Sequence, residues 1–326
     1  EMNGMPMDWK NPKFWAMFLH DMAYREGMGD VLAEGGLRAA PLLGIDEGFA
    51  QRYYSGWGFG GHWDAHAGWL NYLVFPYWVV SALQWATDTR DPYSSSHGYV
   101  QNMMYWGPLA LGRIPGNDIT WEELHNIGER VYGSGDAVDP ESGYKYKAHP
   151  AYYHDKRSVM KDCLPTDDQV FPLIYTVTSE DHYCCVGDIE GPSIDYHLFV
   201  LGTGTEWTEE DFERAAERVY TQERALCVRH WGRDRKMDES VLPAFEYEEN
   251  WVNPILDQKH ALDREQFLPV MDDYYRLLGW DVETGWPTEE RLAELGLADV
   301  YDPMVSGAKS ARETRPAWPE PVAIKL

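Results

Sequence analysis

The sequence predicts a mainly α-helical protein, and three observations support this fold class. Apolar residues recur at three- and four-residue spacing in several long segments. Threonines that can cap a helix N-terminus precede two of these segments, at positions 208 and 288, and a third helix is predicted to begin at Thr120. Strand patterns are scarce, and LIYTVT at 173–178 is the best of them.

The N-terminal third is predicted to contain helices on both sides of a loop. Residues 10–44 repeat apolar side chains at helical spacing, and two helices joined at Gly27–Gly29 are the simplest interpretation. Glycines then alternate with aromatic residues without a period over 48–69, which favours a loop held by aromatic packing. Residues 69–86 are apolar nearly all round and predict a core helix bent at Pro76.

The remaining elements divide the chain into three expected regions. Residues 114–150 are rich in Gly, Asp and Pro around one helix that begins at Thr120. After Thr208 a long helix is predicted, with one apolar face made of Phe212, Ala216, Val219, Leu226 and Cys227. A helix near 263–280 has Pro269 in its first turn or at a kink, and another runs from Thr288 to Gly296. The expected domains are 1–115, an insertion or linker at 116–150, and 151–326.

Composition limits the classes of partner. Acidic residues number 54 against 28 basic ones, and the net charge of −26 opposes extended contact with nucleic-acid phosphates. No stretch has the roughly 20 apolar residues of a membrane span, so a small soluble substrate or a protein partner is expected. The four cysteines (Cys163, Cys184, Cys185 and Cys227) form neither a disulfide framework nor a C-x-x-C pair, which favours a reducing cytoplasm. The vicinal pair is expected to be two small buried thiols.

The stretch MKDCLPTDDQVFP at 160–172 cannot run as one helix. Pro165 removes a backbone donor and restricts the residue before it, so Asp162, Cys163 and Asp167 are predicted to lie on a turn. Two carboxylates and backbone amides there could clamp a polar heterocycle. A turn that is merely solvated fits the same composition.

Two further groups of residues could carry chemistry. Carboxylates and imidazoles gather beside glycine-rich loops, where they could bind a metal or transfer protons, although surface and core roles suit them as well: His62, Asp64, His66, Asp88, Asp91 and His97. The 15 Trp and 21 Tyr residues could line a sugar cleft or an apolar pocket, or fill a core.

Long ordered segments resemble one enzyme family. The stretches AAERVYTQERALCVRHWGRDRKMDESVLP and LDREQFLPVMDDYYRLLGWDVETGWPTEERLAELGL resemble the closing helical region of the tungsten- and molybdenum-dependent aldehyde:ferredoxin oxidoreductases, and AYREGMGDVLAEG at 23–35 is similar to a middle segment. The resemblance covers nearly the whole chain. It implies the helical C-terminal domains, with an N-terminal pterin domain and a C-x-x-C-x-x-x-C run expected outside this sequence.

The resemblance assigns roles to the turn after residue 160. The family's D-x-x-G-L-C motif, aligned on DCLPTD, implies that Asp162 binds a pterin, with Cys163 and Leu164 beside it. Pro165 then replaces the glycine, and Asp167 stands where a [4Fe–4S] cysteine is expected. Three possibilities stay open: Asp167 ligates iron, Cys163, Cys184 or Cys185 substitutes for the cysteine, or no cluster binds.

Another segment implies a proton-transfer residue. LQWATDTRDPYSSSHGY resembles the family's A-T-x-x-R-G-x-x-H-x-R stretch and places His97 near the metal, although the following arginine is absent. GHWDAH aligns with a pterin-contacting loop, so His62 and His66 are candidate cofactor contacts.

The resemblance implies a tungsten, or molybdenum, bis-pterin oxidoreductase that interconverts aldehydes and carboxylic acids. Its electrons would pass to ferredoxin or an iron–sulfur subunit, and a homodimer is possible. A low-potential aromatic acyl-CoA reductase of the same family is the first alternative, because the aromatic loop suits a flat substrate. A carbohydrate-active or carbohydrate-binding helical protein is the alternative from another class, and a structural subunit without catalysis is a further one.

Overall fold

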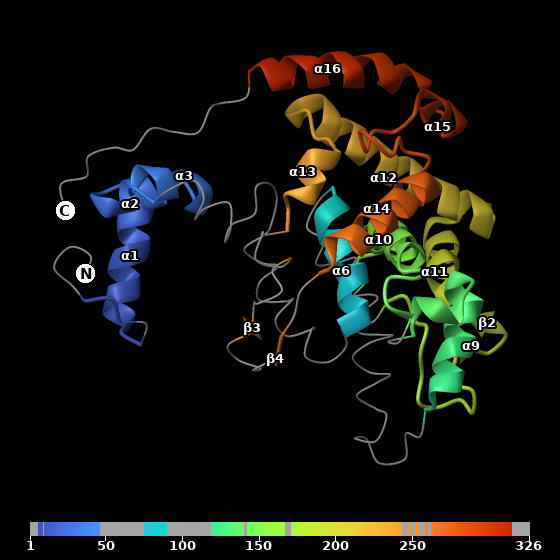
Figure 1. The fold of residues 1–326 in the computed structure, drawn as a ribbon. Helices are drawn as coiled ribbons and strands as arrows, with labels where there is room; N and C mark the ends of the chain where they lie inside the picture. Colours follow the sequence, from blue (N-terminus) through green and yellow to red (C-terminus); the bar gives the residue numbers. More distant parts are fainter. Residues whose placement is uncertain are drawn as a thin grey trace.

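The computed structural model describes residues 6–8, 10–45, 75–89, 119–139, 142–166, 171–242, 247, 252–253, 258–259 and 262–314. Helices dominate these residues, which confirms the predicted mainly α class (Figure 1). The two sheets that the described residues contain are antiparallel pairs of two-residue strands. The architecture is therefore one of packed helices.

The elements follow one another along the chain in three stretches. The N-terminal stretch contains α1 (Pro12–Tyr24), α2 (Met28–Leu32), α3 (Gly36–Leu42) and α6 (Phe75–Thr87). The middle contains α9 (Trp121–Tyr132), η2 (Gly135–Ala137), α10 (Ala148–Cys163), β1 (Cys185–Val186), β2 (Ile189–Glu190), η4 (Gly191–Ser193) and α11 (Ile194–Thr203). The last stretch contains α12 (Glu209–Trp231), α13 (Arg235–Glu239), β3 (Val252–Asn253), β4 (Gln258–Lys259), α14 (Arg264–Leu278), α15 (Glu289–Glu294), η6 (Ala298–Val300) and α16 (Tyr301–Glu313).

The first segment forms three helices where the sequence predicted two. The side chain of Asn11 accepts a hydrogen bond from the N–H of Lys13 and starts α1, and Arg25 ends it in a left-handed conformation. Gly35, with φ +83°, separates α2 from α3. At Gly29, a Cβ would stand 2.2 Å from the carbonyl carbon of Asp21, so only glycine lets α2 fold back on α1.

The centre of the main helical body is α10. It packs against α6, α9, α12 and α14, and Figure 1 shows it among these helices. Burial extends round the helix and includes charged side chains: Asp155, Lys156, Arg157 and Lys161. A helix with this composition would normally lie at a surface, so it depends on partners supplied by its neighbours.

Helix α6 supplies much of the apolar core. Its side chains from Val79 to Thr87 are all buried, which confirms the predicted core helix. Pro76 is the second of the helical residues described for α6, and because residues 69–74 lie outside the described residues the predicted bend at Pro76 stays a prediction.

The predicted caps are present, but the predicted apolar face of α12 is partly wrong. Thr120 and Thr208 form complete capping boxes, and Thr288 caps α15. On α12, however, Val219 and Leu226 are 40% and 44% exposed. The buried stripe runs instead through positions four residues apart or nearly so: Phe212, Ala216, Tyr220, Arg224, Ala225 and Val228. Tyr220 and Arg224 can be buried because their polar atoms form hydrogen bonds, and a pattern of apolar residues in the sequence does not reveal such bonds.

Two other expectations are narrowed. Pro269 lies inside α14, so the first-turn alternative is wrong and the kink stays a prediction. The predicted strand at 173–178 contributes only an isolated bridge from Tyr175 to Tyr183, because its neighbour turns away into the β1–β2 hairpin. Gly191 closes this corner, since a Cβ there would stand 1.7 Å from the carbonyl oxygen of Leu173.

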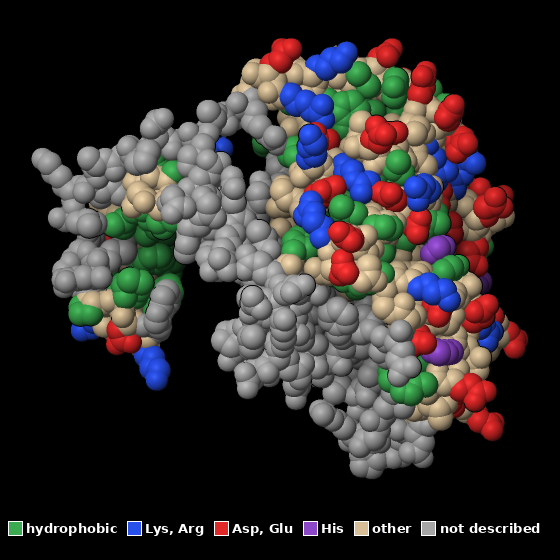
Figure 2. Space-filling view, in the orientation of Figure 1, with side chains coloured by type: hydrophobic (Ala, Val, Ile, Leu, Met, Phe, Trp, Pro, Cys, Tyr) green, Lys and Arg blue, Asp and Glu red, His purple; other side chains and the backbone are tan. Residues whose placement is uncertain are grey.

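Helix α16 lies directly on α12. Gly307 faces Arg229, where a Cβ would be 2.8 Å from the Arg229 carbonyl oxygen. Acidic and basic side chains are interspersed over the face of the molecule seen in Figure 2. Within the described residues, no helix is long and apolar enough to cross a bilayer.

Candidate functional site

The stretch that carries Asp162 stands at the C-terminal end of α10. The sequence predicted a turn for Asp162 and Cys163, but they are the last two helical residues, and the turn begins at Leu164. The N–H of Leu164 donates to the carbonyl oxygens of Met160 and Lys161, both at 3.1 Å, and that of Thr166 donates to Lys161 at 3.2 Å. These bonds close the helix before Pro165, as proline geometry requires.

The helix end presents polar groups to solvent. Asp162 and Cys163 are exposed, and Leu164 is half-buried. Pro165 has φ +24°, in the left-handed region that favours glycine. The predicted correspondence of Pro165 with the glycine of the family motif stays a prediction.

A buried network joins α10 to α6, the helix that leads toward His97. The side-chain nitrogen of Gln84 donates to Asp155 at 3.1 Å, and the hydroxyl of Tyr274 donates to the same carboxylate. The hydroxyls of Tyr220 and Tyr274 lie 2.8 Å apart. Burial, followed by the charge of Asp155, raises the pKa of both phenols far above the usual value, so they stay neutral donors.

A second buried network holds the C-terminal end of α6. Arg233 donates to the carbonyl oxygens of Asp88 at 2.6 Å and Ala86 at 3.0 Å, and to the carboxylate of Asp238 at 2.7 Å. Arg224 makes a bidentate pair with Asp238 at 3.0 and 2.6 Å. Burial opposes ionisation of Asp238, but the two guanidinium charges outweigh it and hold its pKa below the usual range. The chain therefore leaves α6 from a fixed point.

Several predicted site residues lie outside the described residues: His62, His66, His97 and Asp167, together with Asp64 and Asp91. Their roles stay predictions. Asp88 is described and buried at the end of α6.

The vicinal cysteines differ from each other. Cys184 is buried, and Cys185 is exposed, so the expectation of two buried thiols is wrong for Cys185. Adjacent residues of extended backbone point to opposite faces, which explains the difference. One cluster could therefore use only one of this pair without rearrangement. Within the described residues, a single group of three potential metal ligands occurs, at His20, Asp21 and Glu26, and no cysteine belongs to it.

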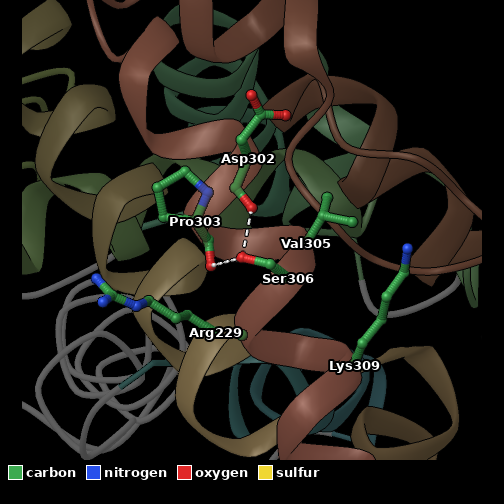
Figure 3. A pocket seen from close by; sticks show the side chains of 7 residues that line it. Arg229, Asp302, Pro303, Val305, Ser306 and Lys309 are labelled. Atoms are coloured by element: carbon green, nitrogen blue, oxygen red, sulfur yellow. Dashed lines mark hydrogen bonds between the residues drawn. The ribbon is translucent and has the colours of Figure 1, made fainter.

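A shallow groove of about 750 Å³ lies between α12 and α16. Figure 3 shows Arg229 and Lys309 on its two sides, with Ser306 between them donating to the carbonyl oxygens of Asp302 and Pro303. None of the sequence-predicted site residues lines this groove.

Comparison with known families decides the relationship. Residues 1–55 and 133–297 match the model of aldehyde ferredoxin oxidoreductase, domains 2 and 3. The chain belongs to this family. The matched range includes all of α10 and the Asp162 turn, as well as the hairpin with Cys184 and Cys185.

Two curated aldehyde ferredoxin oxidoreductases illustrate the relationship. The tungsten-containing aldehyde ferredoxin oxidoreductase of Pyrococcus furiosus is 24% identical over 309 residues, which are 91% of this chain and 38% of the relative. The protein of the same name from Pyrococcus abyssi is 24% identical over 306 residues, 91% of this chain and 39% of the relative. The chain thus spans about two fifths of the length of these relatives.

The acceptor at the end of α10 fits a pterin. An ionised carboxylate accepts hydrogen bonds from ring N–H and amino donors, and Asp162 is exposed. The sequence did not reveal the buried charges that hold α10 in place. One sequence feature could have indicated them. Four consecutive ionisable residues, HDKR at 154–157, lie about two helical turns or less before Asp162.

Proposed function

We propose that this chain is the cofactor-holding C-terminal part of a tungsten bis-pterin oxidoreductase that interconverts aldehydes and carboxylic acids. The observation that supports the proposal is the family match across α10, whose end presents Asp162, the predicted pterin-binding residue, to solvent. When bound, the cofactor would supply the two-electron chemistry, with electrons leaving toward ferredoxin or an iron–sulfur subunit.

The residues of the chain bind, orient and carry protons in this proposal. Asp162 accepts hydrogen bonds from the heterocycle, and the backbone hydrogen bonds of Leu164 and Thr166 end the helix directly after it. The Arg233 clamp fixes the end of α6, from which the chain continues toward His97, the proposed proton carrier. The hydrogen bond from Gln84 to Asp155 ties α6, which precedes His97 in the sequence, to α10, which carries Asp162.

The experiment uses the complete enzyme with Asp162→Ala and a matched Asp188→Ala control. Asp188 is an exposed acid at the turn of the β1–β2 hairpin. We expect Asp162→Ala to lower tungsten content, extractable pterin and aldehyde oxidation together, while the control keeps all three. Undiminished tungsten, pterin and turnover in Asp162→Ala would overturn the assignment.

The substrate assay separates the alternatives. Aldehyde oxidation with a low-potential electron acceptor supports the proposal. Reduction of an aromatic acyl-CoA by the same protein would instead support the alternative function, an aromatic acyl-CoA reductase. A protein without tungsten that binds glycans would refute both redox functions.

A further inference from the structure

The interface between α10 and α11 contains buried polar atoms that lack partners. Asp195, in the first turn of α11, is fully buried, and within the described residues neither of its carboxylate oxygens accepts a hydrogen bond. Nε and Nη1 of Arg157, on α10, also lack hydrogen-bond partners there, and so does the phenol oxygen of Tyr153. Such atoms are rare in folded proteins, and several at one place point to a polar guest.

The geometry of the pair indicates what that guest is. Nη1 of Arg157 lies 3.9 Å from Oδ2 of Asp195, which is too long for a direct hydrogen bond. The other side of the guanidinium is held by Glu213 on α12, at 2.5 Å from Nη2. Arg157 therefore cannot turn to Asp195 without giving up an ion pair, and a small molecule with both donor and acceptor capacity satisfies the two groups at once.

The charges around Asp195 come from two helices. Arg157 and Lys161 of α10 favour its ionised form, while Glu213 of α12 opposes it. Burial is the strongest influence and raises the pKa of Asp195 to about 6. The phenol of Tyr153 also interacts with Asp195, and Glu209 lies 3.8 Å from the guanidinium of Arg157.

We propose that Asp195 and Arg157 form an internal proton-binding site, in which a water molecule joins the guanidinium to the carboxyl group and Asp195 takes up and releases the proton. The ligand is water together with its proton. Glu213 pairs with Arg157 at 2.5 Å and with the buried Lys156 at 3.4 Å, and the side chain of Glu213 is 27% exposed, so in this proposal the proton exchanges with solvent through Glu213.

The position on α10 gives the site a role, and this part rests on the proposed function. Lys161 lies four residues after Arg157, on the same side of the helix, and Asp162 follows about 7.5 Å along the axis from Arg157. Conversion of an aldehyde and one water to a carboxylic acid releases two electrons and two protons. In the proposed function the two electrons would leave to ferredoxin or an iron–sulfur subunit and one proton would leave through His97, while Asp195 takes up the other proton and releases it on the Glu213 side.

Infrared difference spectroscopy of the complete enzyme between acid and neutral pH tests the site directly. We expect a carboxylic-acid carbonyl band that appears as the pH falls through about 6, is absent in Asp195→Asn, and returns at a shifted position in Asp195→Glu. Asp188→Asn, at an exposed acid, should leave the band unchanged. A high-resolution crystal structure at neutral pH should show water between Arg157 and Asp195.

Activity tests the role separately. Asp195→Asn should keep full tungsten and pterin content but lower the turnover number severalfold and remove the inflection near pH 6 from its pH profile. If the band persists in Asp195→Asn, or the two side chains bond directly without water, the site is refuted. If the band behaves as expected and turnover does not change, the catalytic role is refuted. A protein that shows the band but oxidises no aldehyde refutes the proposed function and leaves the site standing.

Discussion

Substitution of Asp238 by Asn should destabilise the protein strongly, because this carboxylate balances two buried cations. Arg224 and Asp238 are fully buried and Arg233 is 3% exposed, and Asp238 also accepts a hydrogen bond from Tyr275 at 2.6 Å. Asn keeps the volume but removes the charge, so both guanidinium groups lose the carboxylate that they share.

Removing one partner of a buried ion pair costs about 3–5 kcal/mol of unfolding free energy. Because Arg233 also holds the end of α6, the loss should fall at the upper part of this range. A loss of this size lowers the melting temperature by on the order of 10 °C. Urea denaturation followed by circular dichroism, with calorimetry as a second method, measures both quantities.

Asp273→Asn is the matched control on α14. Asp273 pairs with Arg276 at 2.8 Å, but the two side chains are 63% and 59% exposed, so the change should cost less than about 1 kcal/mol. If Asp238→Asn and Asp273→Asn lose similar free energy, the reasoning from buried charge is wrong.

Three further substitutions test other features. Burial raises the pKa of Asp195 to about 6, so the stability that its neutral carboxyl group contributes is complete below pH 3.8 and is lost as the pH rises through about 6. Asp195→Asn does not titrate, and its unfolding free energy should therefore gain up to about 3 kcal/mol relative to wild type across that interval. Urea denaturation at several pH values measures this difference. Equal pH dependence of the two proteins would contradict this. Thr208→Ala removes the capping box of α12 and should cost about 1 kcal/mol in unfolding free energy; an unchanged denaturation midpoint would argue against the cap. Gly191→Ala should cost several kcal/mol or prevent folding, since its Cβ meets the Leu173 carbonyl, whereas Gly202→Ala, with open space around it, should be neutral or slightly stabilising in the same melting experiment.

Local signals in the sequence were sufficient for the helices that start with a cap. Thr120, Thr208 and Thr288 each accept the expected hydrogen bond, because capping involves only residues within three positions. The core helix around Val79–Thr87 was also predictable, since a continuous apolar run has nowhere else to lie.

Long-range packing decided what the sequence could not show. Val219 and Leu226 look like core residues by type, but Tyr220 and Arg224 occupy the buried face, because Asp155 and Asp238 from other helices satisfy their polar atoms. The predicted turn at Asp162 and Cys163 is wrong because Pro165 restricts only the residue directly before it. The helix therefore continues to Cys163 and ends with Leu164 as its C-cap.

The sequence by itself determined the helical class, the capped starts of helices and the family resemblance that points to Asp162. Each of these depends on the order of residues over short distances. The tertiary structure alone decided that residues 154–161 of α10 are buried and that Asp195 faces Arg157 without a hydrogen bond. The physical reason is that a charge can stay in the interior only where groups distant in the sequence compensate it, and folding is what brings them there.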